Sequence, residues 1–275
     1  MCKPKCLSVL DRIFIATGYR NKNSPTRWAR LVLLLAFMPA LAWSETKPNS
    51  DANALVEKAD SYRRIAESQR VETRVRLFKN GELSKQKVYH VYLRPGRKSL
   101  VLFRSSGEQG QKVLMLDDKF WLLMPKSRRP IRITPMQKLL GEASTGDIAT
   151  MSWHEDYRAM LLGREQLDGR EIDKLELIAA RKGVSYARIE LYLDIGNQQP
   201  LRADLFVNSG KLAKSARFEI GSVDGRERVT RMVLTDAIQK GRVTEVEYLN
   251  NQPWELAERF FNPQYLARNP KLEPR

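Results

Sequence analysis

The sequence predicts a mainly β protein of the α+β class, an incomplete antiparallel barrel of about ten or eleven strands with helices covering its concave face. Three observations predict it. Short segments in which apolar and polar residues alternate follow one another along the chain, tight-turn pairs such as Asn80-Gly81 and Asp224-Gly225 separate them, and one amphipathic helical stretch precedes them. Consecutive strands joined by tight turns form an antiparallel meander, and a sheet of this many strands twists and curls.

The first half of the chain is predicted to open with a helix over 52–69, because Leu55, Ala59 and Tyr62 recur at helical spacing. The polar residues 45–51 before it form a linker that ends in helix-capping residues. A hairpin around Asn80-Gly81 follows the helix. Its strands, and those that come after it, are expected over 71–78, 85–93, 99–103, 111–117, 119–124 and 129–133.

The middle segment 135–162 interrupts the alternation and is expected to be helical and loop-like. A last short helix is expected over 253–261, and the alternating pattern makes 52–262 a single domain with a tail over 263–275. The strands of the second half are expected over 171–180, 186–195, 201–207, 212–220, 227–235 and 242–248.

Residues 1–44 have the order of a cleaved secretion signal. Arg27 and Arg30 precede an apolar run from Leu31 to Leu41, and small residues at Ala42 and Ser44 suit cleavage after Ser44. The run of about 11 residues is too short to span a hydrocarbon layer of about 30 Å. An uncleaved anchor is the alternative. We expect a soluble protein in the bacterial periplasm.

Charge and cysteine content limit the partners of the exported part. Both cysteines, Cys2 and Cys6, lie in the predicted signal, so the remainder has no disulfide and no cysteine metal ligand. That remainder carries 41 Lys and Arg against 31 Asp and Glu. Export argues against nucleic acid, and anionic lipid headgroups or an acidic protein face are the expected partners. The alternative is a solvated surface of mixed charge.

The usual catalytic patterns are missing from the sequence. The two histidines, His90 and His154, lack the spacing of a zinc-protease helix, and there is no Gly-x-Ser-x-Gly elbow or glycine-rich phosphate loop. A glycosidase-like carboxylate pair would require side chains to meet in space, which a sequence does not reveal. The carboxylates considered for such a pair are Asp147, Glu155, Asp156 and Asp194. We expect no catalysis, metal or cofactor.

Residues 111–158 resemble the LolA-like outer-membrane lipoprotein-sorting proteins. The resemblance rests on Lys119–Lys126 with its Trp-x-x-x-Pro segment, on Arg128–Ile133, on Leu140–Ala149, and on Trp153 followed by Asp156-Tyr157. The order of signal peptide, helix, meander, mid-chain insert and further meander fits over about 50–262. The resemblance implies a half-barrel that holds acyl chains of a lipoprotein or lipid under a helical lid, in a branch associated with RND- or MMPL-type exporters. No arginine of this chain matches the family's lid-latching arginine.

If the carrier interpretation holds, apolar residues of the strands line a hydrophobic cavity; a fully packed core is the alternative. The basic run Lys126, Arg128 and Arg129 is a candidate contact for headgroups or an exporter, or else it protects an exposed sheet edge. A sensor or regulatory module on the same fold is the alternative function. The candidate lining residues are Phe103, Met115, Trp121, Leu123, Ile189, Leu191, Leu205, Phe218 and Met232.

Overall fold

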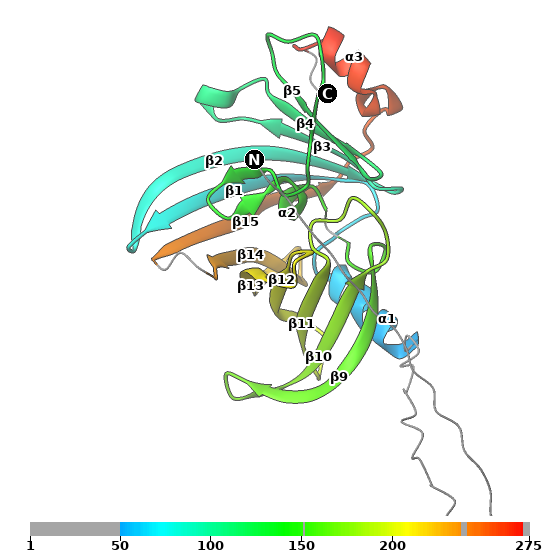
Figure 1. Ribbon diagram of the computed structural model, residues 1–275, viewed down its shortest axis with the longest axis vertical. Coiled ribbons are helices and arrows are strands. Elements are labelled where there is room, and N and C mark those ends of the chain that lie inside the picture. The colour runs from blue at the N-terminus through cyan, green and yellow to red at the C-terminus, as the bar shows by residue number, and fades with distance from the viewer. Residues whose placement is uncertain (1–49, 151, 238–240, 272–275) are drawn as a thin grey trace, which may run out of the picture. The chain divides into compact units, whose positions relative to one another are not determined.

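The computed structural model describes residues 50–150, 152–237 and 241–271 (Figure 1). The chain divides into the units Met1–Ser44 and Glu45–Arg275. The predicted signal peptide and all but the last two residues of the predicted linker lie outside the described residues. Within the described ranges, no helix has the length and apolar character needed to cross a membrane.

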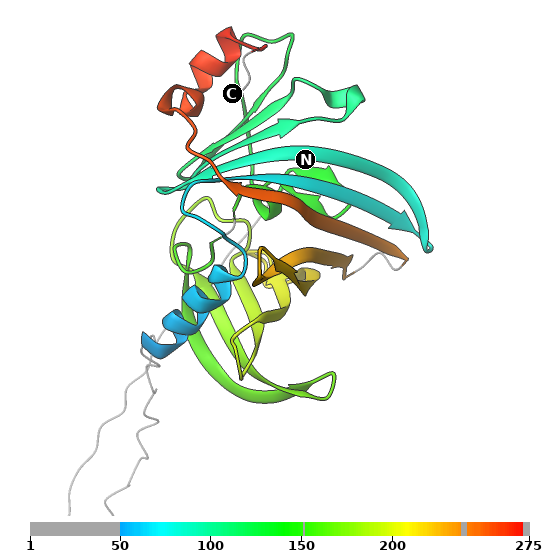
Figure 2. The ribbon, with the colours of Figure 1, turned by 180° about the vertical axis from the view of Figure 1, so that it is seen from behind.

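A single antiparallel sheet of 13 strands dominates the second unit, and it confirms the predicted fold class. The strand order is β6-β5-β4-β3-β2-β1-β15-β14-β13-β12-β11-β10-β9, so β6 and β9 form open edges. Figures 1 and 2 show the strands curving around one face. The strands are β1 Gln69–Lys79, β2 Glu82–Arg94, β3 Lys98–Phe103, β4 Lys112–Leu116, β5 Lys119–Leu123, β6 Ile131–Ile133, β9 Tyr157–Leu167, β10 Arg170–Ala179, β11 Arg188–Asp194, β12 Pro200–Phe206, β13 Leu212–Val223, β14 Arg226–Asp236 and β15 Arg242–Pro253.

The remaining elements are short. A two-stranded hairpin, β7 Lys138–Leu140 with β8 Ala143–Ser144, leads into α2 Thr145–Ala149. The helix α1 Ser50–Ser61 precedes the sheet, and α3 Pro263–Arg268 follows it. Two 3-10 turns, Ser106–Glu108 and Glu258–Phe261, complete the described elements.

The predicted strand number was too low, mainly because the end of the helical segment 135–162 was predicted wrongly. Tyr157–Leu167 is the edge strand β9. Its consecutive Leu161 and Leu162 are both exposed, and Gly163 with φ +145° lies beside a register shift opposite Lys174 and Leu175. A bulge at an open edge breaks the two-residue period, so the pattern did not indicate a strand.

The two helices that were predicted before and after the sheet also differ from the observed ones. The helix predicted over 52–69 ends at Ser61, and the amide of Gln69 then holds the turn by accepting hydrogen bonds from the backbone of Ile65 and Ala66. At the other end, β15 runs to Pro253, so the helix predicted over 253–261 is only the turn at Glu258–Phe261. Residues 263–268, assigned to a tail, form α3.

The sheet buries apolar residues on both faces. The inner cluster runs along the whole concave side and includes Val75, Tyr89, Leu177, Leu191 and Leu234. The outer cluster lies only over β2–β5, where residues 254–268 cover the sheet. It consists of Tyr92, Leu100, Leu102, Leu114, Leu123, Leu256, Phe260, Phe261, Leu266 and Ala267.

Candidate functional site

The inner face of the sheet brings together seven of the nine predicted lining residues. Alternation along each strand points every second side chain inward. The seven in the inner cluster are Phe103, Met115, Ile189, Leu191, Leu205, Phe218 and Met232, all buried. They come from β3, β4 and β11–β14, so strands far apart in the sequence contribute to one apolar surface.

Trp121 and Leu123 lie on the opposite face of the sheet. Their neighbours Phe120 and Leu122 on β5 point inward, and Trp121 and Leu123 pack in the outer cluster with Leu266 of α3. The strand β5 is apolar on both faces, so alternation could not indicate which set points to the concave side. These two residues therefore belong to the packing beneath α3.

A cover segment, residues 134–156 without residue 151, closes the inner face. It comprises the β7–β8 hairpin, α2 and the loop to β9, and it contributes buried apolar side chains to the inner cluster. The Trp153 ring meets Phe218 of β13 edge-on at 5.6 Å between centroids. At Gly146 an added Cβ would lie 1.8 Å from the Ser185 Oγ and 3.2 Å from the Pro135 carbonyl oxygen, so a side chain there would displace Ser185 of the β10–β11 loop.

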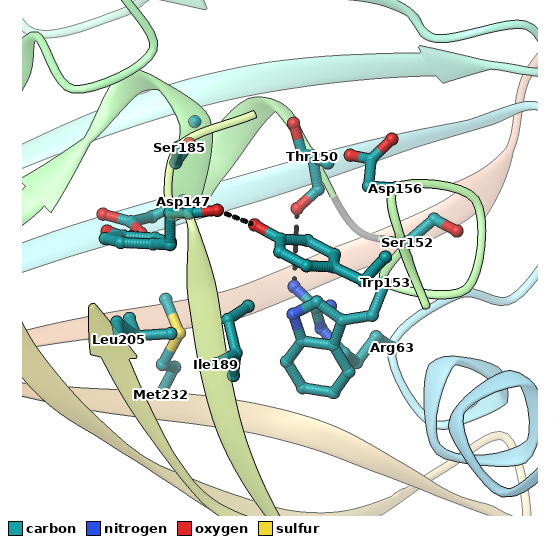
Figure 3. Close-up of a pocket in the computed structure, with 13 residues that line it drawn as sticks. Arg63, Asp147, Thr150, Ser152, Trp153, Asp156, Ser185, Ile189, Leu205 and Met232 are labelled. Carbon is teal, nitrogen blue, oxygen red and sulfur yellow. Dashed lines mark hydrogen bonds between the residues drawn. The ribbon is translucent and has the colours of Figure 1, made fainter. Parts of the chain in front are cut away.

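A small cavity of about 50 Å³ lies between the cover and the middle of the inner face. Figure 3 shows Ile189, Leu205 and Met232 on one side of it and Asp147, Thr150 and Ser152 on another. That volume accommodates roughly three or four waters. A larger cavity of about 250 Å³ lies at the β7–β8 hairpin, where Met136 and Lys138 border it together with Leu212 and Ala213 of β13. Both volumes are below the range of about 300–1,000 Å³ that is usual for ligand pockets. The expected hollow is therefore largely filled by the protein's own residues in this conformation, and an acyl chain lies along the inner face only if the cover moves.

A buried ion pair fastens the middle of the cover to the sheet. The Lys214 Nζ of β13 lies 2.5 Å from the Asp147 Oδ2 of α2, and both side chains are less than 5% exposed. Lys214 also donates to the Glu142 carbonyl, while Asp147 accepts from the Ser144 amide and the Tyr186 hydroxyl, each at 2.7 Å. Burial alone would raise the pKa of Asp147, but the charge of Lys214 and these hydrogen bonds hold it below its usual value.

A second buried pair holds the end of the cover. The Arg97 guanidinium, in the β2–β3 turn, makes a short ion pair with Asp156, and both side chains are almost fully buried. Arg181 lies 3.9 Å from the same carboxylate, and Asp117 and Asp118 lie within 4 Å of Arg97. This cluster joins the cover to the β2–β3 and β4–β5 turns.

A third group of contacts joins the cover to α1. The Asp60 Oδ2 is fully buried and accepts from the backbone N–H groups of Trp153 at 2.6 Å and His154 at 2.9 Å. Arg63 stacks its guanidinium 4.0 Å above the Trp153 ring and donates to the Thr150 carbonyl. The helix α1 therefore holds the cover through polar contacts.

The Asp60–His154 contact predicts a pH dependence. The hydrogen bond from the His154 Nδ1 to the Asp60 carboxylate raises the pKa of His154 above its ordinary 6.5, outweighing burial and the charge of Arg64, while Glu155 adds to the rise. A raised folded-state pKa contributes stability that is full below pH 6.5 and is lost as the pH rises through the folded value. Urea unfolding of wild type against His154→Gln across this range is expected to show the loss only in wild type. If the unfolding free energies of the two proteins change in the same way with pH, the prediction is contradicted.

Each of the four carboxylates considered for catalysis interacts with a different partner. Asp147 pairs with Lys214 and Asp156 with Arg97, while Asp194 accepts from the Gly196 amide in the β11–β12 turn. Glu155 lies 3.5 Å from Arg64. In the part of the chain that the structure describes, no three His, Cys, Asp or Glu side chains gather in a metal-binding arrangement.

The anchors of the cover were not identified from the sequence. Asp60 and Lys214 occupy ordinary positions in an amphipathic helix and an alternating strand, and their partners lie 67 to 94 residues away. Arg97 follows Pro95-Gly96 in a turn, where a charged residue is ordinarily solvated. Its positive φ of 57° is a feature of the structure that the sequence did not signal.

Comparisons with known proteins agree with this architecture. A LolA superfamily protein from Nitrosomonas europaea is 29% identical, with 78% of this chain and 99% of that chain aligned and a TM-score of 0.72. A DUF1329 family protein from Desulfovibrio piger shares the fold at 22% identity, with 79% and 98% aligned and a TM-score of 0.64. A putative outer membrane lipoprotein-sorting protein domain from Vibrio parahaemolyticus does so at 22% identity, with 79% and 99% aligned and a TM-score of 0.63.

No curated protein matches the sequence significantly. A family model does, over residues 95–268, and its description reads "-like: Uncharacterized protein". The model covers more than half of the chain and takes in most of the sheet and the whole cover segment. The chain therefore belongs to this uncharacterized-protein-like family and has the LolA-like fold.

Proposed function

We propose that this protein is a non-catalytic periplasmic carrier that binds the acyl chains of a lipoprotein or lipid against the inner face of its sheet. The carrier passes them toward the outer membrane. The observation that carries the proposal is a continuous apolar concave face whose cover is fixed by separate polar contacts. The likeness to a LolA superfamily protein and the shared fold of a lipoprotein-sorting domain support it.

The energetics of the cargo favour such a carrier. Each methylene of a lipid tail exposed to water costs about 0.8 kcal/mol, so a tail that crosses an aqueous compartment needs an apolar host. The inner face offers that host once the cover moves, because tail methylenes then replace Ile148, Ala149 and Trp153 against the sheet. The exchange keeps the apolar surface of the inner face covered before and after loading.

The proposed location and loading partner follow from the same interpretation. We propose that residues 1–44 direct export and are removed, and that an RND- or MMPL-type exporter supplies the cargo. A lipid leaving an inner membrane needs a protein that lifts its tails, and a carrier takes them before they meet water. Co-purification of the carrier with an exporter's periplasmic part tests this partnership.

The binding site can be tested by photo-crosslinking. A fatty acid carrying a diazirine in mid-chain is incubated with protein recovered from the periplasm, irradiated, and mapped by peptide mass spectrometry. Labels are expected on inner-face residues such as Ile189, Leu205 and Met232, with the outer-face residues Leu100 and Leu114 as the internal control. Labelling confined to the outer face would contradict the proposal.

Native mass spectrometry of the same preparation identifies the cargo. An added mass equal to a lipid or an acylated peptide is expected. A bare protein bound stably to one protein partner would instead favour a sensor or regulatory module.

A further inference from the structure

The connection between β5 and β6 forms a basic projection at one edge of the sheet. Lys126, Arg128, Arg129 and Arg132 are all exposed in it, and residues 119–133 contain no Asp or Glu. The turn is ordered by its own hydrogen bonds, because the Ser127 N–H donates to the Met124 carbonyl at 3.0 Å and the Arg129 N–H donates to the Ser127 Oγ at 3.2 Å. The positive charge is therefore presented on a defined hairpin.

The C-terminal helix adds two cations beside this hairpin. Leu266 and Ala267 of α3 pack in the outer cluster with Leu123 at the end of β5, and Lys112, opposite Leu123 in register, donates its Nζ to the Pro270 carbonyl at 2.5 Å. Figures 1 and 2 both show α3 next to β5 and the loop after it. Arg268, the last residue of α3, and Lys271 after it are both exposed, and residues 259–271 contain no acidic residue. We call the six cations the basic surface.

The charge of the basic surface is uncompensated among the described residues. None of its six cations has a carboxylate within 4.0 Å there, whereas Arg164, Arg181 and Arg217, which are also exposed, each have one. Glu258, which precedes α3, pairs instead with Lys98 at 2.6 Å and Arg94 at 2.9 Å. Glu273, which follows α3, lies outside the described residues. Among the described residues, these cations therefore lack an acidic partner and are available to an external anion.

Apolar groups accompany these cations. The Arg132 guanidinium lies 4.6 Å above the Trp121 ring, its cross-strand partner, and Trp121 is partly exposed. Ile131, the next residue along β6, is 48% exposed. Basic residues around a Trp and an exposed aliphatic side chain are the composition of proteins that rest on a lipid interface.

We propose that the basic surface docks the protein on anionic phospholipid bilayers. The surface spreads over a hairpin and a helix end, so it suits many headgroups at once better than a single bound anion. Each cation near an anionic membrane strengthens binding about five-fold, so six of them suffice for measurable association. The inference is independent of acyl-chain uptake, because the basic surface lies at the β6 edge and over the outer cluster.

The test compares two variants of equal charge in the full exported protein. The hairpin variant carries Lys126→Gln, Arg128→Gln, Arg129→Gln and Arg132→Gln. The control variant carries Lys85→Gln, Lys182→Gln, Lys211→Gln and Arg226→Gln, which are exposed, without an ion pair among the described residues, and remote in sequence from the basic surface. Both are first checked for an unchanged urea midpoint, and any contribution of the N-terminal segment is common to all three proteins.

Co-sedimentation is measured with phosphatidylglycerol–phosphatidylethanolamine vesicles and with phosphatidylcholine vesicles. Wild type and control are expected to bind the anionic vesicles at low salt, and the hairpin variant at least about 100-fold more weakly. Binding is also expected to disappear near 1 M salt, where the screening length is about 3 Å. Equal binding by the two variants, salt-independent binding, or no preference of wild type for anionic vesicles would overturn the proposal.

Discussion

The Lys214→Met variant is expected to lose about 3–5 kcal/mol of unfolding free energy, since it leaves the Asp147 carboxylate buried without its counter-charge. The loss is measured from urea unfolding curves at neutral pH. The pKa of Asp147 is depressed in the folded protein, so the pair contributes stability above the carboxyl's unfolded pKa of about 3.9 and loses it as the pH falls through the lower folded value.

The Asp147→Asn/Lys214→Met double variant is the control for this prediction. The asparagine amide oxygen still accepts from the Ser144 amide or the Tyr186 hydroxyl, and no charge remains buried. The double variant is expected to recover most of the loss, because replacing both members of a buried pair is often close to neutral. If the losses of Asp147→Asn and Lys214→Met simply add, the two residues do not act as a pair.

The Asp60→Leu variant is expected to cost about 3–5 kcal/mol, because two backbone N–H groups, those of Trp153 and His154, lose their acceptor and Arg63 loses its buried carboxylate. Hydrogen exchange of residues 152–156 is the direct measurement, and the fastest rise is expected there. Because the cover then opens more often, labelling by the photoactivatable fatty acid is also expected to increase.

Glu57→Gln is the matched control on the same helix. Glu57 is exposed and has no partner among the described residues, so a change within about 0.5 kcal/mol is expected. An Asp60→Leu protein with unchanged exchange at 152–156 would show that α1 does not hold the cover.

The sequence was most informative where one face of a strand is polar. The strands β11 and β13 alternate cleanly, and Ile189, Leu191, Ala216 and Phe218 are all buried on the inner face as predicted. Tight-turn pairs such as Asn80-Gly81 located the hairpins because few other residues adopt their positive φ values of 51° and 85°. Strand alternation and tight turns depend on residues that are neighbours in the sequence, so a single sequence is enough to predict them.

Features that depend on distant partners were not predictable. The orientation of β5 depends on α3, which packs with the outer cluster that contains Leu123 and that Trp121 packs against. Without α3, the outer face of β5 would be expected to be polar. The closure of the inner face likewise depends on Asp60, Arg97 and Lys214 meeting residues of the cover. Charged residues are ordinarily exposed, so their burial becomes apparent only in three dimensions.

The pairing of β1 with β15 has a consequence for how the chain is made. Lys79 lies opposite Arg242, so the first strand of the sheet completes its ladder only with the last one. Two meanders of local hairpins can assemble early, but their junction awaits the final part of the polypeptide, and such long-range pairing slows folding. Until that strand arrives, β1 and β14 each present a bare ladder edge, which is when a newly made chain is most exposed to aggregation.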